Sequence, residues 1–403
     1  MLKRKMLDRL IEWKKNKGKE CLLVKGARQV GKTYIIEKFG HEYYKSYIYI
    51  NLIEKPAIRD IFEGDLSAEE IYKRMSLSIP NIKFADHDTL IFLDEIQACP
   101  QARTAFKFLA IDNRYDIIGS GSLLGISYKE IESIPVGYET QIEMHSLDFE
   151  EFLWAVGLDD KAVGYIKEYF DKKVAVPAVI HYSMMKYLRE YVVTGGMPAV
   201  INKYRKNSNF SEVQAEQQKI IDRYLDDISK YASAYEKPKA RNCYLSIPKQ
   251  LAKENKKFQF AVVEKGSSAR KYEKDNWYKL YLNDVGILVS MYGFEMKKAI
   301  INDTLTGEAK GGIYENLVAD MLIKRGYKLY YFRNEKNSQE IEFMITKNSG
   351  VIPIEVKSGN GATLSLKTLL MQSDIQYGYK LISGNVGISG KKITLPLYMA
   401  MFL

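Results

Sequence analysis

One short segment fits the phosphate-loop pattern G-x-x-x-x-G-K-[ST] at every fixed position, and it constrains the fold more than any other part of the chain. The apolar run at 21–24 before it predicts a buried strand, and the run after it predicts a helix that ends at Gly40. The residues expected to hold the phosphates are Gly26, Ala27, Arg28, Gln29, Val30, Gly31, Lys32, Thr33 and Tyr34.

The fixed residues of this segment each have a chemical task. Gly26 and Gly31 allow a tight turn whose N–H groups, together with a helix N-terminus, surround the β-phosphate. Lys32 is expected to reach the β- and γ-phosphates as a catalytic residue, and the hydroxyl of Thr33 to bind Mg²⁺. The segment therefore predicts an ATP site with Mg²⁺. The alternative is a glycine turn that binds nothing.

Length and composition bound the class of protein. A chain of 403 residues is too long for one ordinary core, and 46% hydrophobic with 27% charged residues is typical of a globular protein. The chain lacks an apolar run long enough for a bilayer span or a signal peptide, so we expect a cytoplasmic protein without a membrane partner. The cysteines and histidines are scattered, which predicts neither a disulfide framework nor a zinc site.

A second segment, at 89–95, predicts a strand that is buried on both faces and ends in two carboxylates. Open α/β sheets bind ligands at the carboxyl ends of their strands, so we expect Asp94 and Glu95 beside the phosphate loop. Asp94 would hold Mg²⁺, mostly through water, and Glu95 would polarise the water that attacks the γ-phosphate. The alternative is a carboxylate pair that only caps a helix.

Further strands are predicted at 46–52, 115–120 and 139–145, with helices between them at 67–75 and 101–112. This alternation indicates a parallel sheet of about five strands with right-handed crossovers. Ser120 and Ser122 stand where ATPases of the additional-strand group carry a polar sensor for the γ-phosphate, and Ser120 is our candidate; the alternative is a turn residue. Ser67 and Glu70 have the spacing of a helix capping box.

Helices are predicted beyond Asp148, at 149–154, 161–170, 184–194 and 211–231, and we assign them to a lid on the nucleotide domain. Gly195 and Gly196, with Pro198 beyond, provide the expected stop for the third of these helices. Arg189 and Arg223 are candidate nucleotide sensors. The alternative for each is a solvated arginine.

Residues 237–279 contain twelve Lys or Arg against four Asp or Glu, an excess of +8 within a net charge of +10. Such a block predicts DNA or another polyanion as a partner. A helix beginning at Ser246 and another near Trp277, followed by a strand that includes Leu288, indicate a winged-helix unit. The residues expected to neutralise phosphates are Lys256, Lys257, Lys265, Arg270 and Lys271. The alternative is a solvated basic face.

The last hundred residues predict a helix at 313–322 and strands at 328–332, 340–345 and 351–357. Glu342, Glu355 and Lys357 lie at related ends of the last two strands. Two carboxylates and a lysine can hold a divalent metal and activate water for phosphodiester cleavage. The alternative is that these charges only occupy solvated strand ends.

Taken together, the motifs resemble those of bacterial and archaeal AAA-like P-loop ATPases whose C-terminal domain, of uncharacterised function, is related in fold to the PD-(D/E)xK nucleases. The shared motifs lie at 26–33, 92–97, 119–122, 194–199, 314–317 and 352–359, so the resemblance covers nearly the whole chain. We expect a P-loop ATPase core at 1–147, a helical lid at 148–236, a winged-helix-like basic domain at 237–300 and a restriction-endonuclease-like α/β domain at 301–403. The motif at 314–317 adds Glu315 to the candidate nuclease residues.

Two positions depart from the family pattern. Relatives usually show Gly-Arg shortly before the fifth strand, where this chain has Gly137 and Tyr138, so we expect a nucleotide-sensing arginine to be missing. The nuclease pattern favours aspartate at the position of Glu342, whose longer side chain carries its carboxylate further from the backbone. Both departures predict reduced activity.

The leading hypothesis is therefore an ATP-binding protein that hydrolyses ATP slowly with Mg²⁺ as a conformational switch, with nucleic acid as a candidate partner. Two alternatives stay open, namely a metal-dependent nuclease gated by the ATPase and a non-enzymatic regulatory protein tethered to nucleic acid. A homo-oligomer is compatible with each hypothesis.

Overall fold

The computed structural model describes residues 2–16, 18–122, 137–253, 256, 279–333, 339–348, 350–358 and 364–403. Contacts between Cα atoms divide the chain into two compact units. We call Arg4–Ser146 the N-terminal unit, and Leu147–Leu403 together with Met1–Lys3 the C-terminal unit. Each unit is described by itself.

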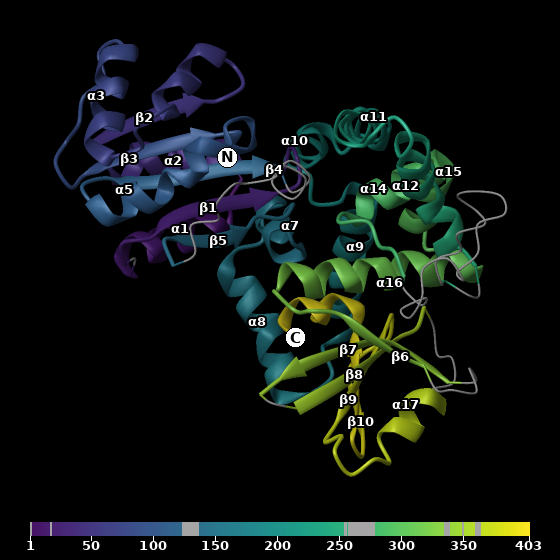
Figure 1. The fold of residues 1–403 in the computed structure, drawn as a ribbon. Helices are drawn as coiled ribbons and strands as arrows, with labels where there is room; N and C mark the ends of the chain where they lie inside the picture. The colour runs from purple at the N-terminus through teal and green to yellow at the C-terminus, as the bar shows by residue number, and fades with distance from the viewer. Residues whose placement is uncertain are drawn as a thin grey trace. The chain divides into compact units, whose positions relative to one another are not determined.

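A five-stranded parallel sheet forms the centre of the N-terminal unit (Figure 1). The strands are β1 (Cys21–Gly26), β2 (Ser46–Asn51), β3 (Thr89–Asp94), β4 (Asp116–Ser122) and β5 (Glu139–Glu143), in the order β2-β3-β4-β1-β5. Because β4 lies between β1 and β3, the order agrees with the additional-strand prediction. The predicted parallel sheet is confirmed.

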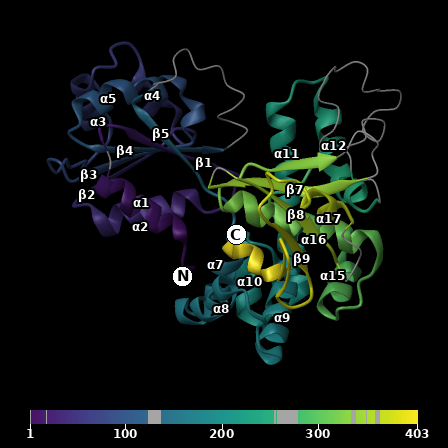
Figure 2. The same cartoon turned by 90° about the horizontal axis from the view of Figure 1, so that it is seen from below.

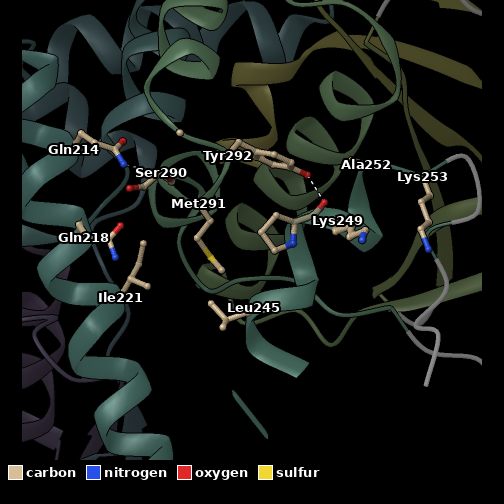
Figure 3. A pocket seen from close by; sticks show the side chains of 12 residues that line it. Gln214, Gln218, Ile221, Leu245, Lys249, Ala252, Lys253, Ser290, Met291 and Tyr292 are labelled. Carbon is tan, nitrogen blue, oxygen red and sulfur yellow. Dashed lines mark hydrogen bonds between the residues drawn. The ribbon is translucent and has the colours of Figure 1, made fainter. Parts of the chain in front are cut away.

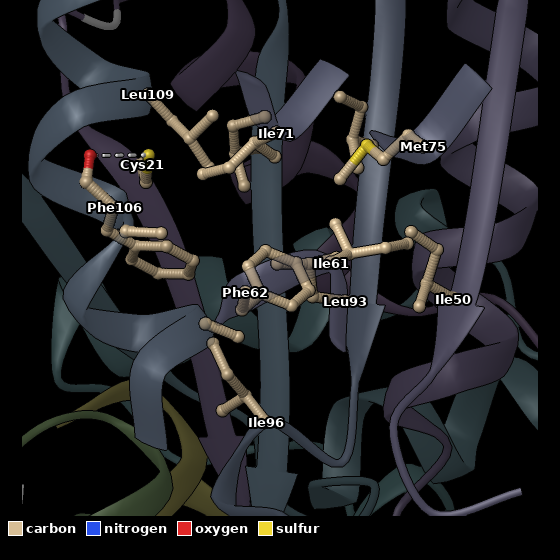
Figure 4. Close-up of a cluster of buried hydrophobic side chains, with 14 of the residues drawn as sticks. Cys21, Ile50, Ile61, Phe62, Ile71, Met75, Leu93, Ile96, Phe106 and Leu109 are labelled. Atoms are coloured by element: carbon tan, nitrogen blue, oxygen red, sulfur yellow. Dashed lines mark hydrogen bonds between the residues drawn. The ribbon is translucent and has the colours of Figure 1, made fainter. Parts of the chain in front are cut away.

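Helices cover both faces of this sheet, with α1 and α2 on one face and α3, α4 and α5 on the other (Figure 2). Their bounds are α1 (Lys5–Asn16), α2 (Lys32–Tyr43), α3 (Ala68–Ser78), α4 (Pro100–Thr104) and α5 (Phe106–Asp112), and 3₁₀ turns lie at η1 (Pro56–Phe62) and η2 (Ile96–Ala98). Every residue of β3 is buried, which explains its unbroken apolar run. The core between the sheet and α3 and α5 includes Phe62, Ile71 and Phe106 (Figure 4).

Two local predictions for the N-terminal unit need correction. The helix predicted at 101–112 is divided into α4 and α5, with Ala105 between them. Ser67 is the N-cap of α3, but its side chain makes no capping hydrogen bond, so the predicted capping box is wrong. A capping box is found instead at Asp148, which accepts from the backbone N–H of Glu151 over 2.8 Å.

Helices make up the first part of the C-terminal unit, and the four helices predicted there are confirmed. The four correspond to α7 (Phe149–Ala155), α8 (Asp160–Lys172), α9 (Ala178–Thr194) and α11 (Phe210–Tyr231). This part of the unit also contains α10 (Pro198–Asn207), α12 (Lys237–Leu251), α14 (Val285–Tyr292) and α15 (Phe294–Ile301). Within the described part of the chain, no helix is long and apolar enough to cross a membrane.

The winged-helix prediction fails at two points in the described residues. Ser246 lies near the end of α12, where a helix was predicted to begin. Leu288 belongs to α14 and not to a strand, because the side chain of Asp284 caps this helix and accepts from the N–H of Ile287 over 3.1 Å. The apolar residues of this segment therefore pack as a buried helix.

The motif at 194–199 forms a close junction within the C-terminal unit. The N–H of Gly196 donates to Asp284 Oδ2 over 2.7 Å, and the N–H of Leu147 donates to the carbonyl of Gly196 over 2.7 Å. A Cβ on Gly196 would overlap with the carbonyl of Leu147, and Gly195 has a φ of +75°. The glycines therefore do more than end α9, because they let three chain segments approach one another.

A six-stranded mixed sheet follows, in the order β10-β11-β9-β8-β7-β6. Its strands are β6 (Tyr330–Arg333), β7 (Glu340–Lys347), β8 (Gly350–Val356), β9 (Gly378–Ile382), β10 (Gly387–Ser389) and β11 (Lys392–Pro396). The described residues of this part also form α16 (Gly307–Lys324), α17 (Leu364–Leu369) and the 3₁₀ helix η4 (Leu397–Phe402). Strands β6, β7 and β8 pair antiparallel, whereas β8 and β9 are parallel.

Candidate functional site

The predicted phosphate loop joins β1 to α2, and its backbone contains two left-handed residues. Gly31, the N-cap of α2, has a φ of 95°, and Gln29 has a φ of 65°. Gly26 is required for a different reason from the predicted tight turn, because a Cβ there would overlap with the carbonyl of Met144. The loop therefore begins beside the segment that follows β5.

Lys32 lies in the first turn of α2 and folds back over its own loop. Its Nζ donates to the carbonyls of Gly26 over 3.0 Å and Ala27 over 2.9 Å. Burial lowers the pKa of Lys32 from 10.5 to about 8, although the carboxylates of Glu95 and Asp94 act in the opposite direction. The lysine thus lies near the carboxylates of Asp94 and Glu95.

Asp94, the last residue of β3, lies at the centre of a hydrogen-bond network. Only 5% of its surface is exposed. Thr33 Oγ1 donates to Asp94 Oδ2 over 2.9 Å, and the hydroxyl of Ser120 donates to Oδ1. The hydroxyl of Tyr49 donates to Oδ2 over 3.2 Å. The structure thus brings Lys32, Thr33, Asp94 and Ser120 together from three separate parts of the sequence.

Glu95 follows directly in an unusual backbone conformation. Its φ of 56° lies in the left-handed region, which a non-glycine residue adopts only at a cost that surrounding contacts must offset. Its N–H donates to Asp94 Oδ1 over 3.0 Å, and its carboxylate accepts from the side-chain amide of Gln97. Glu95 is therefore held at the edge of the sheet where the phosphate loop also lies.

Two contributors to this site were missed by sequence reasoning. Arg4, 8% exposed, donates from Nη1 to the carbonyl of Val30 over 2.9 Å and from Nη2 to the carbonyl of His145 over 2.7 Å. Tyr49 donates to Asp94, as described above. Neither residue belongs to a phosphate-loop pattern. For Tyr49, the alternation of tyrosine and isoleucine along β2 was the signal that could have placed its side chain on one face of the strand.

Tyr138, which stands where relatives usually carry an arginine, lies beside the start of β1. Its carbonyl accepts from the N–H of Cys21 over 2.9 Å, at the start of β1, and its side chain packs against the hydrophobic core. The phosphate loop follows the other end of β1. The expectation that a nucleotide-sensing arginine is missing at the position of Tyr138 stays a prediction.

The two arginines predicted as sensors both lie in the C-terminal unit. Arg189 is buried in α9 and pairs with Asp303 over 3.4 Å, so its alternative assignment as a solvated arginine is wrong. Arg223 lies on the exposed part of α11. Their role as sensors stays a prediction.

Three of the predicted nuclease residues converge in the C-terminal unit. Lys357 Nζ lies 3.1 Å from Glu342 Oε1 and 3.3 Å from Glu355 Oε1, and the N–H of Val356 donates to Glu342 Oε2 over 3.2 Å. Burial raises the pKa of Glu342 and of Glu355, and the cation of Lys357 opposes this shift. The three side chains therefore form one charged cluster between the ends of β7 and β8.

Glu315, on α16 and 1% exposed, forms ion pairs with two lysine side chains. Its carboxylate lies 2.7 Å from Lys256 Nζ and 2.9 Å from Lys279 Nζ, and it accepts from the hydroxyl of Tyr281 over 2.6 Å. Burial opposes ionisation of Glu315, but the two lysines outweigh it and lower its pKa to about 2. The charge of Glu315 is thus compensated within the unit.

Lys256 was predicted to contact nucleic-acid phosphates, and this prediction is corrected, because its ammonium group is paired with the buried Glu315. The other predicted contacts, Lys257, Lys265, Arg270 and Lys271, lie outside the described residues. Among the residues that the structure describes, there is no group of three His, Cys, Asp or Glu side chains that could hold a metal ion.

A separate groove of about 950 Å³ lies between α11, α12 and the end of α14 (Figure 3). Gln214 Nε2 donates to the carbonyl of Ser290 over 3.1 Å. Within the described residues, Gln214 Oε1 and Ser290 Oγ are buried without a hydrogen-bond partner. Of the predicted site residues that the structure describes, none lines this groove.

One of three matching family models covers the phosphate loop. Residues 18–153 match a family model described as an AAA domain. Residues 185–278 and 310–398 match two models described as domains of unknown function, DUF8612 and DUF4143 respectively.

The curated proteins contain no match to the chain. A solved structure titled "Structure of C. elegans PCH-2" is 13% identical, with a TM-score of 0.27, over 51% of this chain and 61% of that chain. The family match and the parallel sheet, with β4 between β1 and β3, lead to the same conclusion: the chain contains an AAA-like P-loop ATPase domain.

Proposed function

We propose that this protein binds ATP with Mg²⁺ and hydrolyses it slowly, as a conformational switch. The observation that carries the proposal is the convergence of Lys32, Thr33 and Ser120 on the end of β3, where Asp94 and Glu95 lie. A lysine and a hydroxyl at the start of a helix, facing two carboxylates at the end of a strand, are groups that phosphoryl transfer from ATP uses.

The donor set fits a magnesium nucleotide. Thr33 Oγ1 and Asp94 Oδ2, 2.9 Å apart, are hard oxygen ligands of the kind that Mg²⁺ prefers, and they would hold the ion directly or through water. When bound, Mg²⁺ would neutralise charge on the phosphates. Gly31, in the left-handed region, is the N-cap of α2, and the N–H groups at a helix N-terminus stabilise phosphate charge.

The chain's own residues then have distinct roles. Lys32 would exchange its two backbone carbonyl acceptors for phosphate oxygens, which carry more negative charge. Glu95 would accept the proton of the attacking water, with Gln97 orienting its carboxylate. Ser120 would report the state of the site through its hydrogen bond to Asp94.

We expect hydrolysis to be slow until a second cation faces the γ-phosphate, supplied by Arg28, by Arg189 or Arg223, or by a partner. An arginine in this position accelerates such reactions strongly. Other arginines of the N-terminal unit are committed elsewhere, namely Arg59 to the carbonyl of Leu52, Arg103 to Glu139 and Arg114 to Asp112.

Nucleotide binding and turnover test this proposal directly. We expect wild type to bind a fluorescent ATP analogue and to release phosphate, Lys32→Ala to lose binding, and Glu95→Gln to bind without turnover. Lys107→Ala, at an exposed position on α5, is a matched control for loss of a lysine. If wild type fails to bind the analogue, the proposal is wrong.

A second candidate function is metal-dependent cleavage of nucleic acid by the C-terminal unit. The observation that favours it is the convergence of Glu342, Glu355 and Lys357, in a sheet with the chain order α16-β6-β7-β8-α17-β9. Glu355 Oε2, buried without a hydrogen-bond partner among the described residues, is the atom best suited to accept a cation. Glu315 fits this role poorly, because Lys256 and Lys279 already compensate its charge.

Cleavage assays with DNA and RNA in Mg²⁺ or Mn²⁺ test this second function. We expect Glu355→Gln and Lys357→Ala to abolish cleavage and Lys347→Ala, at the far end of β7, to retain it. Equal cleavage by wild type and Glu355→Gln would show that the activity comes from another source.

A further inference from the structure

Side chains from both neighbours of β3 approach the carboxylate of Asp94. Because β3 lies between β2 and β4, Tyr49 reaches it from one side and Ser120 from the other. Tyr49 and Thr33 share Oδ2, whereas Ser120 and the N–H of Glu95 share Oδ1. Each carboxylate oxygen therefore accepts two hydrogen bonds, and together these fix its rotation.

The hydroxyl of Tyr49 is itself held in place by the end of β2. Asn51 Nδ2 donates to the oxygen of Tyr49 over 3.2 Å. Asn51 Oδ1 in turn accepts from the N–H groups of Ile53 over 2.9 Å and Glu54 over 3.0 Å. Because Asn51 occupies an acceptor position on the phenol oxygen, the phenol proton is directed towards Asp94.

The ring of Tyr49 is not part of the hydrophobic core. Its residue is 40% exposed, and its ring centroid lies 5.5 Å from that of Phe92. Replacement by phenylalanine would keep this ring contact and remove only the hydroxyl. The hydrogen bond to Asp94 can therefore be separated from the packing of β2.

We propose that Tyr49 is a positioning residue that orients Asp94 for Mg²⁺ and thereby sets how strongly the ion tightens nucleotide binding. This inference rests on the proposed function, since it requires ATP and Mg²⁺ at the phosphate loop. Without the hydroxyl, Asp94 loses one of four donors and can rotate away from the orientation that the ion needs. Affinity for nucleotide in the absence of Mg²⁺ depends on the loop and Lys32, and stays unchanged.

The test measures the affinity for a fluorescent ATP analogue in EDTA and in Mg²⁺, using the full chain. For wild type we expect Mg²⁺ to tighten binding. For Tyr49→Phe we expect this tightening to be about tenfold smaller, as for loss of one hydrogen bond to a charged group, with the affinity in EDTA preserved. Asn51→Ala should reduce the tightening in the same direction, because the phenol proton loses its orientation.

Tyr47→Phe is the matched control, since it removes a hydroxyl from the same strand. Within the described residues, the hydroxyl of Tyr47 is buried without a hydrogen-bond partner, and its ring packs against Gly40 and His41. Equal tightening in wild type and Tyr49→Phe, or loss of affinity in EDTA as well, would overturn the role of Tyr49 while the proposed function stands. If wild type does not bind the analogue at all, both the proposed function and the role of Tyr49 are wrong.

Discussion

Thr33 Oγ1 and Asp94 Oδ2 lie 2.9 Å apart and join the start of α2 to the end of β3. The two residues are separated by 61 positions in the sequence. Their contact connects the phosphate loop with the carboxylates that follow the buried strand, so a change at either residue is expected to affect both halves of the site.

Removal of the Thr33 hydroxyl should weaken the response to Mg²⁺. We expect Thr33→Ala to raise the Mg²⁺ concentration for half-maximal ATP turnover by about tenfold, because one hydrogen bond or ligand to a charged group is lost. Thr33→Ser, which keeps the hydroxyl, should stay close to wild type. Similar values for the alanine and serine variants would exclude a role for this oxygen.

The pKa of Lys32 predicts a pH dependence of nucleotide binding. Burial lowers this pKa to about 8 in the free protein, and phosphate charge in the complex favours the protonated lysine. The affinity for ATP should therefore be highest below pH 8. It should fall as the pH rises above 8, by up to about tenfold per pH unit. Titration calorimetry in two buffers of different ionisation enthalpy at pH 8.5 should detect proton uptake on binding, and Lys32→Ala should lack it.

The same pKa has an opposite consequence for folding. The unfolded chain holds its proton up to the ordinary pKa of 10.5, whereas the folded protein loses it near 8. Below pH 8, burial of the charged lysine therefore lowers the free energy of unfolding. This loss of stability disappears as the pH rises from 8 to 10.5.

Arg4 should support the phosphate loop although it lies outside it. Its guanidinium holds the carbonyls of Val30 and His145, and each bond from a charged donor contributes about 1.5–3 kcal/mol. We expect Arg4→Met to lower the affinity for ATP at least tenfold and to reduce the melting temperature. Arg9→Met, at an exposed position on α1, is the control. Unchanged affinity in Arg4→Met would show that the loop keeps its conformation without this support.

Gly26 is expected to tolerate no side chain. A Cβ at this position would overlap with the carbonyl of Met144, and such overpacking costs about 1–3 kcal/mol. Gly26→Ala should therefore lower the midpoint of urea unfolding, whereas Gly18→Ala, where a Cβ meets nothing within 4 Å, should not. Equal midpoints for the two variants would contradict the close approach between the end of β1 and Met144, which follows β5.

Sequence reasoning succeeded where the signal is local. The glycines, lysine and threonine at 26–33 are contiguous, and the apolar run of β3 ends at its carboxylates, so both could be predicted from spacing alone. The alternation of strands and helices likewise predicted the parallel sheet. These features depend on backbone conformation and burial within a few residues.

Predictions failed where a partner from another element decides the outcome. Leu288 has the apolar character of a strand, but capping by Asp284 places it in α14. Lys256 looks like a phosphate contact in a basic segment, but the buried carboxylate of Glu315 binds it. Charge composition cannot show such a pairing, because the partner lies 59 positions further along the chain.

The sequence by itself determined that a phosphate loop and a buried strand ending in two carboxylates are present, because these patterns arise from neighbouring residues. Only the tertiary structure decided which distant side chains complete the site. Tyr49 and Ser120 meet Asp94 because β2 and β4 lie on either side of β3, and Arg4 reaches Val30 from before the first helix. The order and register of the strands fix these contacts, since they bring residues from distant parts of the chain within hydrogen-bonding distance.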